Sequence, residues 1–395
     1  MSEAITVKRA RPLLMVVVTH PIQYYAPLYR RLAARNRLNL HVTYLSDAGA
    51  STYVDPGFGR EIAWDVPLLD GYDYTVLRPR LPLSDLGFWG RSDPGLAGVL
   101  ARTAPDWVLI YGYASRMNWA TVRWARKAGA RVAYTSDSNI NDPRSRAVQM
   151  IKRPLLRKFF ASIDAFFAPS DSNVAYLRSF DAPDARIHHV PFAIDTARFR
   201  VGAPGPGAAR PYDFLWAGKF IALKRPGDFV DALDRLARST SRTIRACLVG
   251  DGPLDATLRQ RANVLPENCE LSFLGFVNQA GMPGVLQGTD ALVFSSDREP
   301  YGLIATEAAA AGAALIVADT IGCVGKRSVA RPGVNTLTYR VGDVAALAAQ
   351  MQLLLDDREV LRRMQQASTE IAEQHDVEHA AAAIESVITR GPFND

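Results

Sequence analysis

The stretch ALVFSSDREPYGLIATEAAAAG, residues 291–312, has the pattern of a buried strand, a loop and a helix. Residues 291–296 form a short apolar run, which is typical of a strand covered on both faces. The alanine-rich segment after it contains strong helix formers, and Gly312 is a typical end point for a helix. This unit predicts an α/β fold with a parallel sheet, whose ligands bind at the carboxyl ends of the strands.

The same alternation runs along the whole chain and predicts two domains, because 395 residues are too many for one ordinary core. The segment RVGAPGPGAARPY (200–212) is rich in glycine and proline, as linkers are. We predict two doubly wound, Rossmann-like domains, residues 1–200 and 201–377, that face a central cleft, with a C-terminal helix (about 378–395) packed back on the first. The predicted strands are 13–18, 40–45, 107–111, 131–135 and 164–169 in the first half, and 213–218, 244–250, 271–275, 291–296 and 314–319 in the second.

Composition narrows the class of protein. A hydrophobic fraction of 48% and a charged fraction of 22% are typical of a soluble globular protein. The net charge of +6 is diffuse, so we expect no nucleic-acid partner. Three cysteines without metal-ligand spacing favour a reducing cytoplasm. The apolar run at 13–18 is shorter than a secretory signal core, and we expect a buried first strand there and no membrane-spanning segment.

The loop and helix start within 291–312 predict an anion site flanked by two acids. The amides of Tyr301, Gly302 and Leu303 fall near the helix N-terminus, where they suit a phosphate. Glu299 and Glu307, eight positions apart, could each accept hydrogen bonds from sugar hydroxyls. The alternative interpretation is an ordinary solvated helix start. Spacing alone decides little, because Glu370 and Glu378 are also eight apart, in a region without a phosphate loop.

A second junction between a predicted strand and a predicted helix contains two cationic side chains. In WAGKFIALKRPGDF (216–229), Lys219 and Lys224 follow a predicted strand and precede a predicted helix. Two cations at a strand end could clamp a diphosphate, and the alternative is that both are surface lysines.

The order of AGKF…LKRP, LVGDGP (248–253), FLGFV (273–277) and the two glutamates resembles the family 4 retaining glycosyltransferases, which have the GT-B fold and an E-x7-E motif. The resemblance implies that Glu307 holds a nucleotide ribose and Glu299 a hydroxyl of the donor sugar. It implies that Lys219, usually arginine in this family, and Lys224 stabilise the leaving diphosphate, that the amides of Gly302 and Leu303 help, and that Val277 lines the base pocket. It also implies that no metal or other cofactor is required. The chain contains no Asp-x-Asp, the motif that metal-dependent GT-A enzymes usually carry.

The first half matches the family less closely. His20 follows the first predicted strand, where it could contact the donor or the acceptor, or simply pack. Tyr24, Tyr25 and Tyr29 are interpreted as the packing face of a helix rather than a sugar platform. The family commonly has a histidine after its fifth strand, and here Ser136 or Asp137 occupies that place. We select Asp137 as the first-domain residue at the reacting centre.

The segment IKRPLLRKFF (151–160) is basic and apolar. Similar enzymes use such a surface for weak peripheral contact with the inner face of a membrane, and the alternative, which we favour, is an interior helix with a charged outer face. The prediction as a whole is a metal-independent retaining glycosyltransferase of hexosyltransferase type in carbohydrate biosynthesis. Its acceptor would be a saccharide, a lipid-linked molecule or a small molecule. The alternatives are a sugar-nucleotide epimerase of GT-B fold and an inactive scaffold.

Overall fold

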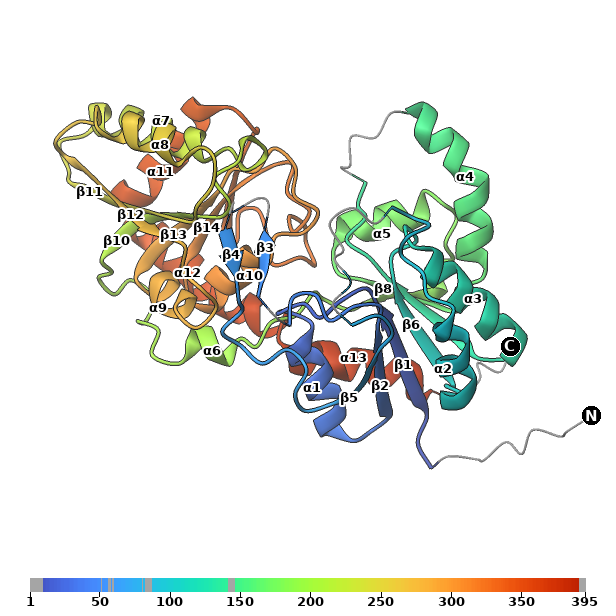
Figure 1. The fold of residues 1–395 in the computed structure, drawn as a ribbon. Helices are drawn as coiled ribbons and strands as arrows, with labels where there is room; N and C mark the ends of the chain where they lie inside the picture. Colours follow the sequence, from blue (N-terminus) through green and yellow to red (C-terminus); the bar gives the residue numbers. More distant parts are fainter. Residues whose placement is uncertain are drawn as a thin grey trace, which may run out of the picture.

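The computed structural model describes residues 10–50, 52–55, 58, 60–79, 81, 87–140 and 146–390. Figure 1 shows two α/β halves side by side, with the N-terminal half carrying α1 to α5 and the C-terminal half carrying α7 to α12. The strand pairs within each large sheet are parallel, which confirms the predicted α/β class.

The first half contains, within the described residues, a seven-stranded sheet in the order β5-β2-β1-β6-β7-β8-β9. Apolar side chains of its central strands are buried on both faces. Its strands are β1 (Leu13–Val18), β2 (Asn39–Tyr44), β5 (Asp73–Val76), β6 (Trp107–Tyr111), β7 (Arg131–Thr135), β8 (Ala165–Ala168) and β9 (Ile187–His189). The helices of this half are α1 (Ala26–Arg35), α2 (Gly95–Thr103), α3 (Arg116–Ala128), α4 (Arg146–Ala161) and α5 (Asp171–Arg178), followed by the 3-10 turn η1 (Asp184–Arg186).

The second half contains, in the part of the chain that is described, a six-stranded sheet in the order β12-β11-β10-β13-β14-β15. The strands are β10 (Tyr212–Ala217), β11 (Ile244–Val249), β12 (Cys269–Gly275), β13 (Thr289–Phe294), β14 (Ala314–Ala318) and β15 (Thr336–Tyr339). Between and after them lie η2 (Ala222–Lys224), α7 (Pro226–Ser239), α8 (Asp255–Ala262), α9 (Met282–Gln287), α10 (Leu303–Ala310), α11 (Val344–Asp356) and α12 (Arg358–Glu373).

The last helix, α13 (Val377–Thr389), lies beside α1 in the N-terminal half (Figure 1). Its Ala380, Ala381 and Ile384 are buried in the same core as Leu14 of β1. Glu378 forms ion pairs with Arg31 and Arg35 of α1. The chain therefore crosses between the halves twice, once through α6 (Ala197–Arg200) and once before α13.

The segment 200–212, predicted as a linker, is tied to the second half by a buried arginine. The Arg210 side chain is 2% exposed, and its guanidinium donates to the carbonyl oxygens of Thr289 at 2.7 Å and Gly312 at 2.9 Å. A buried guanidinium is costly without partners; these carbonyls accept hydrogen bonds from its Nη groups, and the Asp290 carboxylate lies 3.9 Å from its Nε. The linker is thus anchored at its C-terminal end.

Sequence patterns missed the edge strands β5, β9 and β15 and the hairpin of β3 (Tyr53–Asp55) and β4 (Arg60–Ile62). Edge strands are covered less completely than central ones, so they need no continuous apolar run. In β5, for example, no residue is fully buried.

The basic segment 151–160 belongs to α4, whose Leu156, Phe159 and Phe160 are buried while Leu155 is exposed. This is the interior helix that the sequence favoured. Within the described residues, no helix is long and apolar enough to cross a membrane.

Candidate active site

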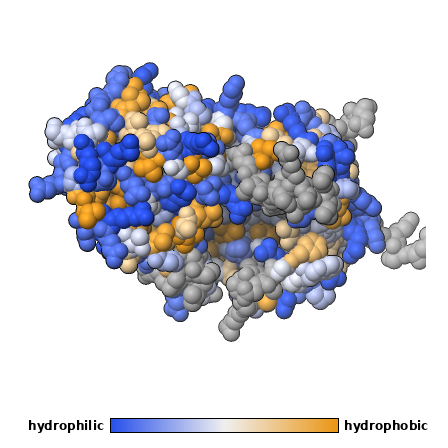
Figure 2. All heavy atoms as spheres, turned by 90° about the horizontal axis from the view of Figure 1, so that it is seen from above, coloured by the Kyte–Doolittle hydropathy of each residue, from blue (hydrophilic) through white to orange (hydrophobic). Residues whose placement is uncertain are grey.

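A cavity of about 350 Å³ lies between the two halves, and it gathers most of the residues that the sequence selected. Seen from above, the molecule is hollowed near its middle, and the floor of this hollow shows apolar residues (Figure 2). The cavity is lined by Tyr24, Tyr25, Phe58, Asp137 and Phe192 from the first half, and by Lys219, Lys224, Ser296, Glu299 and residues 300–304, among others, from the second. Residues separated by more than 250 positions in sequence therefore meet in one space.

The loop between β13 and α10 carries Glu299 and ends at a glycine whose conformation the fold requires. Gly302 has φ +93°, and a Cβ there would lie 2.3 Å from Cε1 of Phe294. Only glycine fits this position without moving the buried ring. The next residues, Leu303 and Ile304, begin α10 and line the cavity, and the first amides of a helix have no partner within it. The start of α10 thus presents partial positive charge to the cavity.

Lys224 is held by a network of backbone contacts below the cavity. It ends the 3-10 turn η2, and the hydroxyl of Ser295 donates to its carbonyl oxygen at 3.2 Å and to that of Arg225 at 2.9 Å. The amide of Asp297 donates to the Leu223 carbonyl at 2.9 Å. These bonds join η2 to the end of β13, and the Lys224 ammonium forms an ion pair with the Glu299 carboxylate.

Lys219 lies on the other side of the same loop, where it faces an aromatic side chain from the first half. Its ammonium is 5.0 Å from the centroid of the Phe58 ring, a cation–π distance. Phe58 also packs edge-on against Phe276, with ring centroids 5.1 Å apart. Val277, the predicted base-pocket residue, follows Phe276 and is partly buried against the second core. It does not belong to the lining of the 350 Å³ cavity as the described residues define it.

Glu307 is also outside that lining, on the fifth residue of α10. Burial raises the pKa of its carboxyl group to about 7, and the nearby guanidinium of Arg198 in α6 offsets part of the shift. A carboxyl group with this pKa exchanges its proton near neutral pH, so a ligand that donates hydrogen bonds to it would favour the ionised form. The role of Glu307 stays a prediction.

Asp137 and Tyr24 bring side chains of the first half to the 350 Å³ cavity. Asp137 follows β7 and lines three adjoining cavities, two of which are also lined by Glu299. Burial raises the pKa of the Tyr24 hydroxyl to about 12, and the carboxylates of Asp137 and Glu299 add to the shift. Carboxylates from both halves therefore raise the pKa of the Tyr24 hydroxyl. Close by, the Asn139 amide donates to the Pro300 carbonyl at 2.9 Å, which links the loop after β7 to the Glu299 loop.

Tyr24, Tyr25 and Tyr29 differ in their surroundings, and the sequence did not show this difference. Tyr29 is 1% exposed and packs against Tyr72, as the interpretation of a packing face requires. That interpretation was incomplete for Tyr24 and Tyr25, which precede α1 and line two cavities. They were missed because the sequence extends the helix pattern over them. A signal was available in Pro27, since proline is favoured in the first turn of a helix.

His20 lies beside these cavities and does not belong to their lining. Its Nδ1 is 2.9 Å from the Thr19 hydroxyl, and burial lowers the pKa of its imidazole to about 4, with a further decrease from Arg91. The ring is therefore neutral near pH 7. Its predicted contact with a substrate stays a prediction, and its neighbour Thr19 is the residue that reaches the cavity wall.

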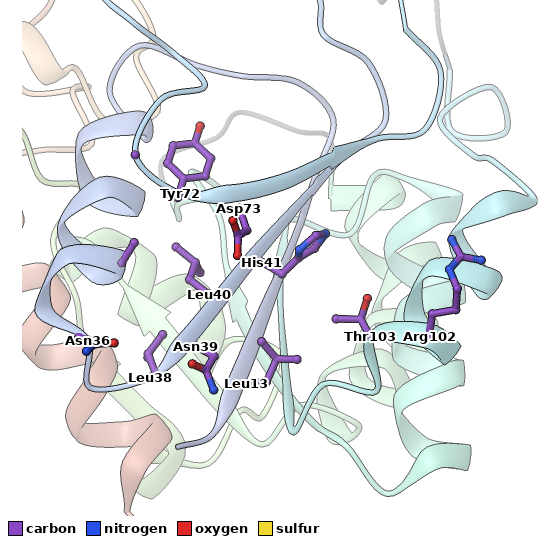
Figure 3. A pocket seen from close by; sticks show the side chains of 12 residues that line it. Leu13, Asn36, Leu38, Asn39, Leu40, His41, Tyr72, Asp73, Arg102 and Thr103 are labelled. Atoms are coloured by element: carbon purple, nitrogen blue, oxygen red, sulfur yellow. The ribbon is translucent and has the colours of Figure 1, made fainter. Parts of the chain in front are cut away.

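A larger cavity, of about 640 Å³, lies at the opposite end of the first sheet (Figure 3). Leu13, Asn39 and Asp73, which line it, stand at the beginnings of β1, β2 and β5. Ligands of doubly wound sheets bind at the carboxyl ends of strands, where the 350 Å³ cavity lies. Size alone would thus select the wrong cavity.

Two family models match the chain and together span both halves. Residues 28–198 match "Glycosyltransferase Family 4", and residues 207–371 match "Glycosyl transferases group 1". The chain belongs to the group 1/family 4 glycosyltransferases. As a member of this family it transfers sugar from a nucleotide sugar.

Relatives and solved structures agree with this membership. A glycogen synthase of Mycobacterium tuberculosis is 26% identical over 312 residues, which cover 79% of this chain and 71% of the relative. The 2-deoxystreptamine N-acetyl-D-glucosaminyltransferase of Streptomyces fradiae is 28% identical over 297 residues, 67% of this chain and 70% of that one. HepE of Anabaena, solved with UDP and glucose, superposes with a TM-score of 0.68 at 16% identity, covering 96% of this chain and all of HepE. These neighbours confirm the predicted GT-B fold.

Proposed function

We propose that the enzyme transfers a hexosyl group from a nucleoside-diphosphate sugar to an acceptor hydroxyl with retention of configuration and without a metal ion. The acceptor would be a saccharide, a lipid-linked molecule or a small molecule of carbohydrate biosynthesis, reached in the cytoplasm or by weak contact with the inner face of a membrane. One observation carries the proposal. Lys219, Lys224, Glu299 and the start of α10 line a single cavity with Asp137 and Tyr24.

The two halves would bind different substrates. The nucleotide would bind residues 201–377, with its ribose at Glu307 and its base near Val277, and the acceptor would bind within residues 1–200. Support for a nucleoside-diphosphate donor comes from the neighbour HepE, whose structures hold UDP, glucose and UDP-glucose. The names of two relatives indicate that the acceptors differ within the family, because one is a glycogen synthase and the other acts on 2-deoxystreptamine.

The reaction would depend on charge placed around the leaving group. When the bond between the anomeric carbon and the diphosphate oxygen breaks, that oxygen keeps the electron pair. The ammonium groups of Lys219 and Lys224 and the first amides of α10 would stabilise the growing negative charge. The acceptor oxygen would then bond to the anomeric carbon on the face that the diphosphate leaves, and the acceptor proton would pass to a diphosphate oxygen. Glu299 would orient the donor sugar by accepting a hydrogen bond from one of its hydroxyls.

Incubation with a panel of nucleotide sugars, with and without an acceptor pool, tests this function. We expect sugar transfer only when acceptor is present, activity that survives EDTA, and a product that keeps the anomeric configuration of the donor, as read by NMR of the new linkage. Conversion of the donor alone to its epimer would instead show the epimerase alternative, and no turnover would favour a scaffold. Activity lost to EDTA and restored by magnesium or manganese would refute the metal-free chemistry.

A further inference from the structure

A second cavity, of about 460 Å³, adjoins the one that holds Glu299 and lies within the first half. The two cavities share three wall residues, Tyr24, Tyr25 and Asp137. Most of the remaining wall comes from the ends of β1, β6 and β7 and the start of α3, at the carboxyl edge of the first sheet, and Arg91 and Lys152 of α4 complete it with Ile22. The volume suits a ligand of one or two sugar rings, since small-molecule sites begin near ~300 Å³.

The wall of this cavity combines aromatic faces with cations. Tyr24, Tyr25, Tyr111 and Tyr113 contribute rings and hydroxyl groups, which suit the apolar faces and the polar edges of a sugar. Arg91 and Lys152 line the same space, while Asp137, at the wall shared with the donor cavity, is the acidic side chain among the described lining residues. Among the described lining residues, positive charge therefore exceeds negative charge.

The backbone of Arg91 is fixed while its side chain remains available. The Arg91 carbonyl accepts hydrogen bonds from the Met117 amide at 3.0 Å and the Ser115 hydroxyl at 3.1 Å, at the start of α3. In the part of the chain that the structure describes, no ion pair or side-chain hydrogen bond holds the Arg91 guanidinium or the Lys152 ammonium. Other arginines of the first half are paired, for example Arg78 with Asp93 and Arg126 with Asp164.

An unpaired guanidinium beside a partly enclosed cavity is a recognition group for anions. Its planar set of donors matches a carboxylate or a phosphate with two parallel hydrogen bonds, and exclusion of water strengthens the attraction. The neighbouring His20 is neutral near pH 7, so it neither neutralises nor repels the anion. With a neutral acceptor, the two cations would outnumber Asp137, the acidic side chain among the described lining residues.

We infer that the acceptor is a sugar or polyol that carries a negatively charged group, a phosphate or a carboxylate, which Arg91 binds with help from Lys152. This inference rests on the proposed glycosyl transfer and specifies the acceptor class. The acceptor ring would pack on the tyrosine wall, with its reacting hydroxyl at the wall formed by Tyr24, Tyr25 and Asp137 and its charged group at Arg91.

Calorimetric titrations of UDP-saturated enzyme test the inference with matched neutral and charged probes: glucose, glucose 6-phosphate and glucuronate, and myo-inositol with myo-inositol 1-phosphate. We expect each charged probe to bind more tightly than its neutral partner. A comparison of the two phosphate probes with glucuronate shows whether the site prefers a phosphate or a carboxylate. Arg91→Gln should weaken binding of the charged probes by roughly 10- to 100-fold, the range for a charged hydrogen bond. Arg91→Lys should retain part of the preference.

Arg123→Gln, an exposed arginine on α3 away from the lining, is the control and should keep the preference of the wild type. UDP should bind equally to all variants, which shows that they are folded and that the donor site is intact. If UDP binds but charged and neutral probes behave alike, including no response from any probe, the inference is overturned while the proposed function stands. If neither UDP nor any other nucleoside diphosphate binds the wild type, the proposed function itself has failed.

Discussion

The Lys224 ammonium and the Glu299 carboxylate, which are expected to contact different parts of the donor, form an ion pair with each other. Both side chains are only partly exposed, at 23% and 16%, so the pair holds them in fixed positions. A diphosphate that enters the cavity must compete with Glu299 for the lysine. Binding of the donor would therefore rearrange this pair, freeing Glu299 for a sugar hydroxyl.

Replacement of Lys224 by alanine should mainly reduce turnover. Negative charge on the diphosphate grows as the bond to the sugar breaks, so a fixed ammonium stabilises the transition state more than the bound donor. We expect kcat to fall by about 100- to 1,000-fold, the usual effect of losing one such group. Steady-state kinetics measure kcat, and calorimetry with the nucleotide sugar should show a much smaller loss of affinity. A variant with normal kcat would remove Lys224 from the mechanism.

Glu299→Gln should have opposite effects on product binding and on transfer. Glutamine removes the internal competitor for Lys224, so UDP should bind as tightly as in the wild type or up to ~1 kcal/mol more tightly, the upper range for a partly exposed ion pair. Transfer should slow, because the amide orients the sugar hydroxyl less well than the carboxylate. Titration with UDP and a transfer assay give the two readings. Weaker UDP binding in this variant would contradict competition within the pair.

Glu307→Ala should weaken nucleotide binding by roughly 1–3 kcal/mol, the range for hydrogen bonds to a charged group. Glu370 provides a matched control, because it begins the second pair of glutamates with the same spacing and is exposed on α12, where it accepts a hydrogen bond from Gln366 at 2.6 Å. Thermal shift with UDP and calorimetry compare the two variants. Equal losses from Glu307→Ala and Glu370→Ala would show that the motif was misread.

Nucleotide affinity should depend on pH through Glu307. Burial raises the pKa of this carboxyl group to about 7 in the free protein, and ribose hydroxyls that donate to it would favour the ionised form. Binding should then release a proton below about pH 7, and affinity should fall as pH decreases, by about tenfold from pH 8 to pH 6. Calorimetry in two buffers of different ionisation enthalpy measures the released proton. A pH-independent affinity would place the ribose elsewhere.

Stability should decline in mild acid because of His375. This side chain is fully buried where the chain returns to the first half, and burial lowers the pKa of its imidazole from 6.5 to about 4. Between these values the unfolded chain binds a proton that the folded protein does not, so the free energy of unfolding falls as pH drops from 6.5 toward 4. Below about pH 4 the imidazole is protonated in both states. The stability that the neutral, buried His375 contributes above pH 6.5 is then lost in full, and this group causes no further decrease.

Urea unfolding at pH 7 and pH 4.5 measures this contribution. His375→Gln should show a smaller loss of stability between the two pH values than the wild type. His379→Gln, an exposed histidine on the same return segment, should behave as the wild type does. If all three proteins lose the same stability, groups other than His375 cause the acid sensitivity.

Much of this protein can be predicted locally. The bounds predicted for 13–18, 107–111 and 131–135 match β1, β6 and β7 to the residue. These strands are central, so burial on both faces imposes an uninterrupted apolar run that one sequence reveals. The Glu299 loop was predictable for a similar reason, because a strand end, a glycine with positive φ and a helix start follow one another within ten residues.

The remaining features depend on contacts that no local pattern records. Edge strand β5 pairs on one side only, so its sequence carries a weak signal. Phe58 over Lys219, and Tyr24 beside both Asp137 and Glu299, join residues of the two halves. Nothing in the sequence near Tyr24 shows that its hydroxyl faces a cavity instead of the core.

The sequence by itself determined the α/β class and the two sets of βα units, since each follows from backbone preferences and apolar periodicity over a few turns of chain. The predicted donor-site residues came instead from an order of motifs that resembles the family 4 glycosyltransferases. The tertiary structure alone decided that Lys224 pairs with Glu299, 75 positions away, and that Arg91, unpaired within the described residues, stands at a tyrosine-lined cavity. The physical reason is that charge pairing and cavity shape depend on distances in space, which are set only when the two sheets pack their cores and their loops meet across the cleft.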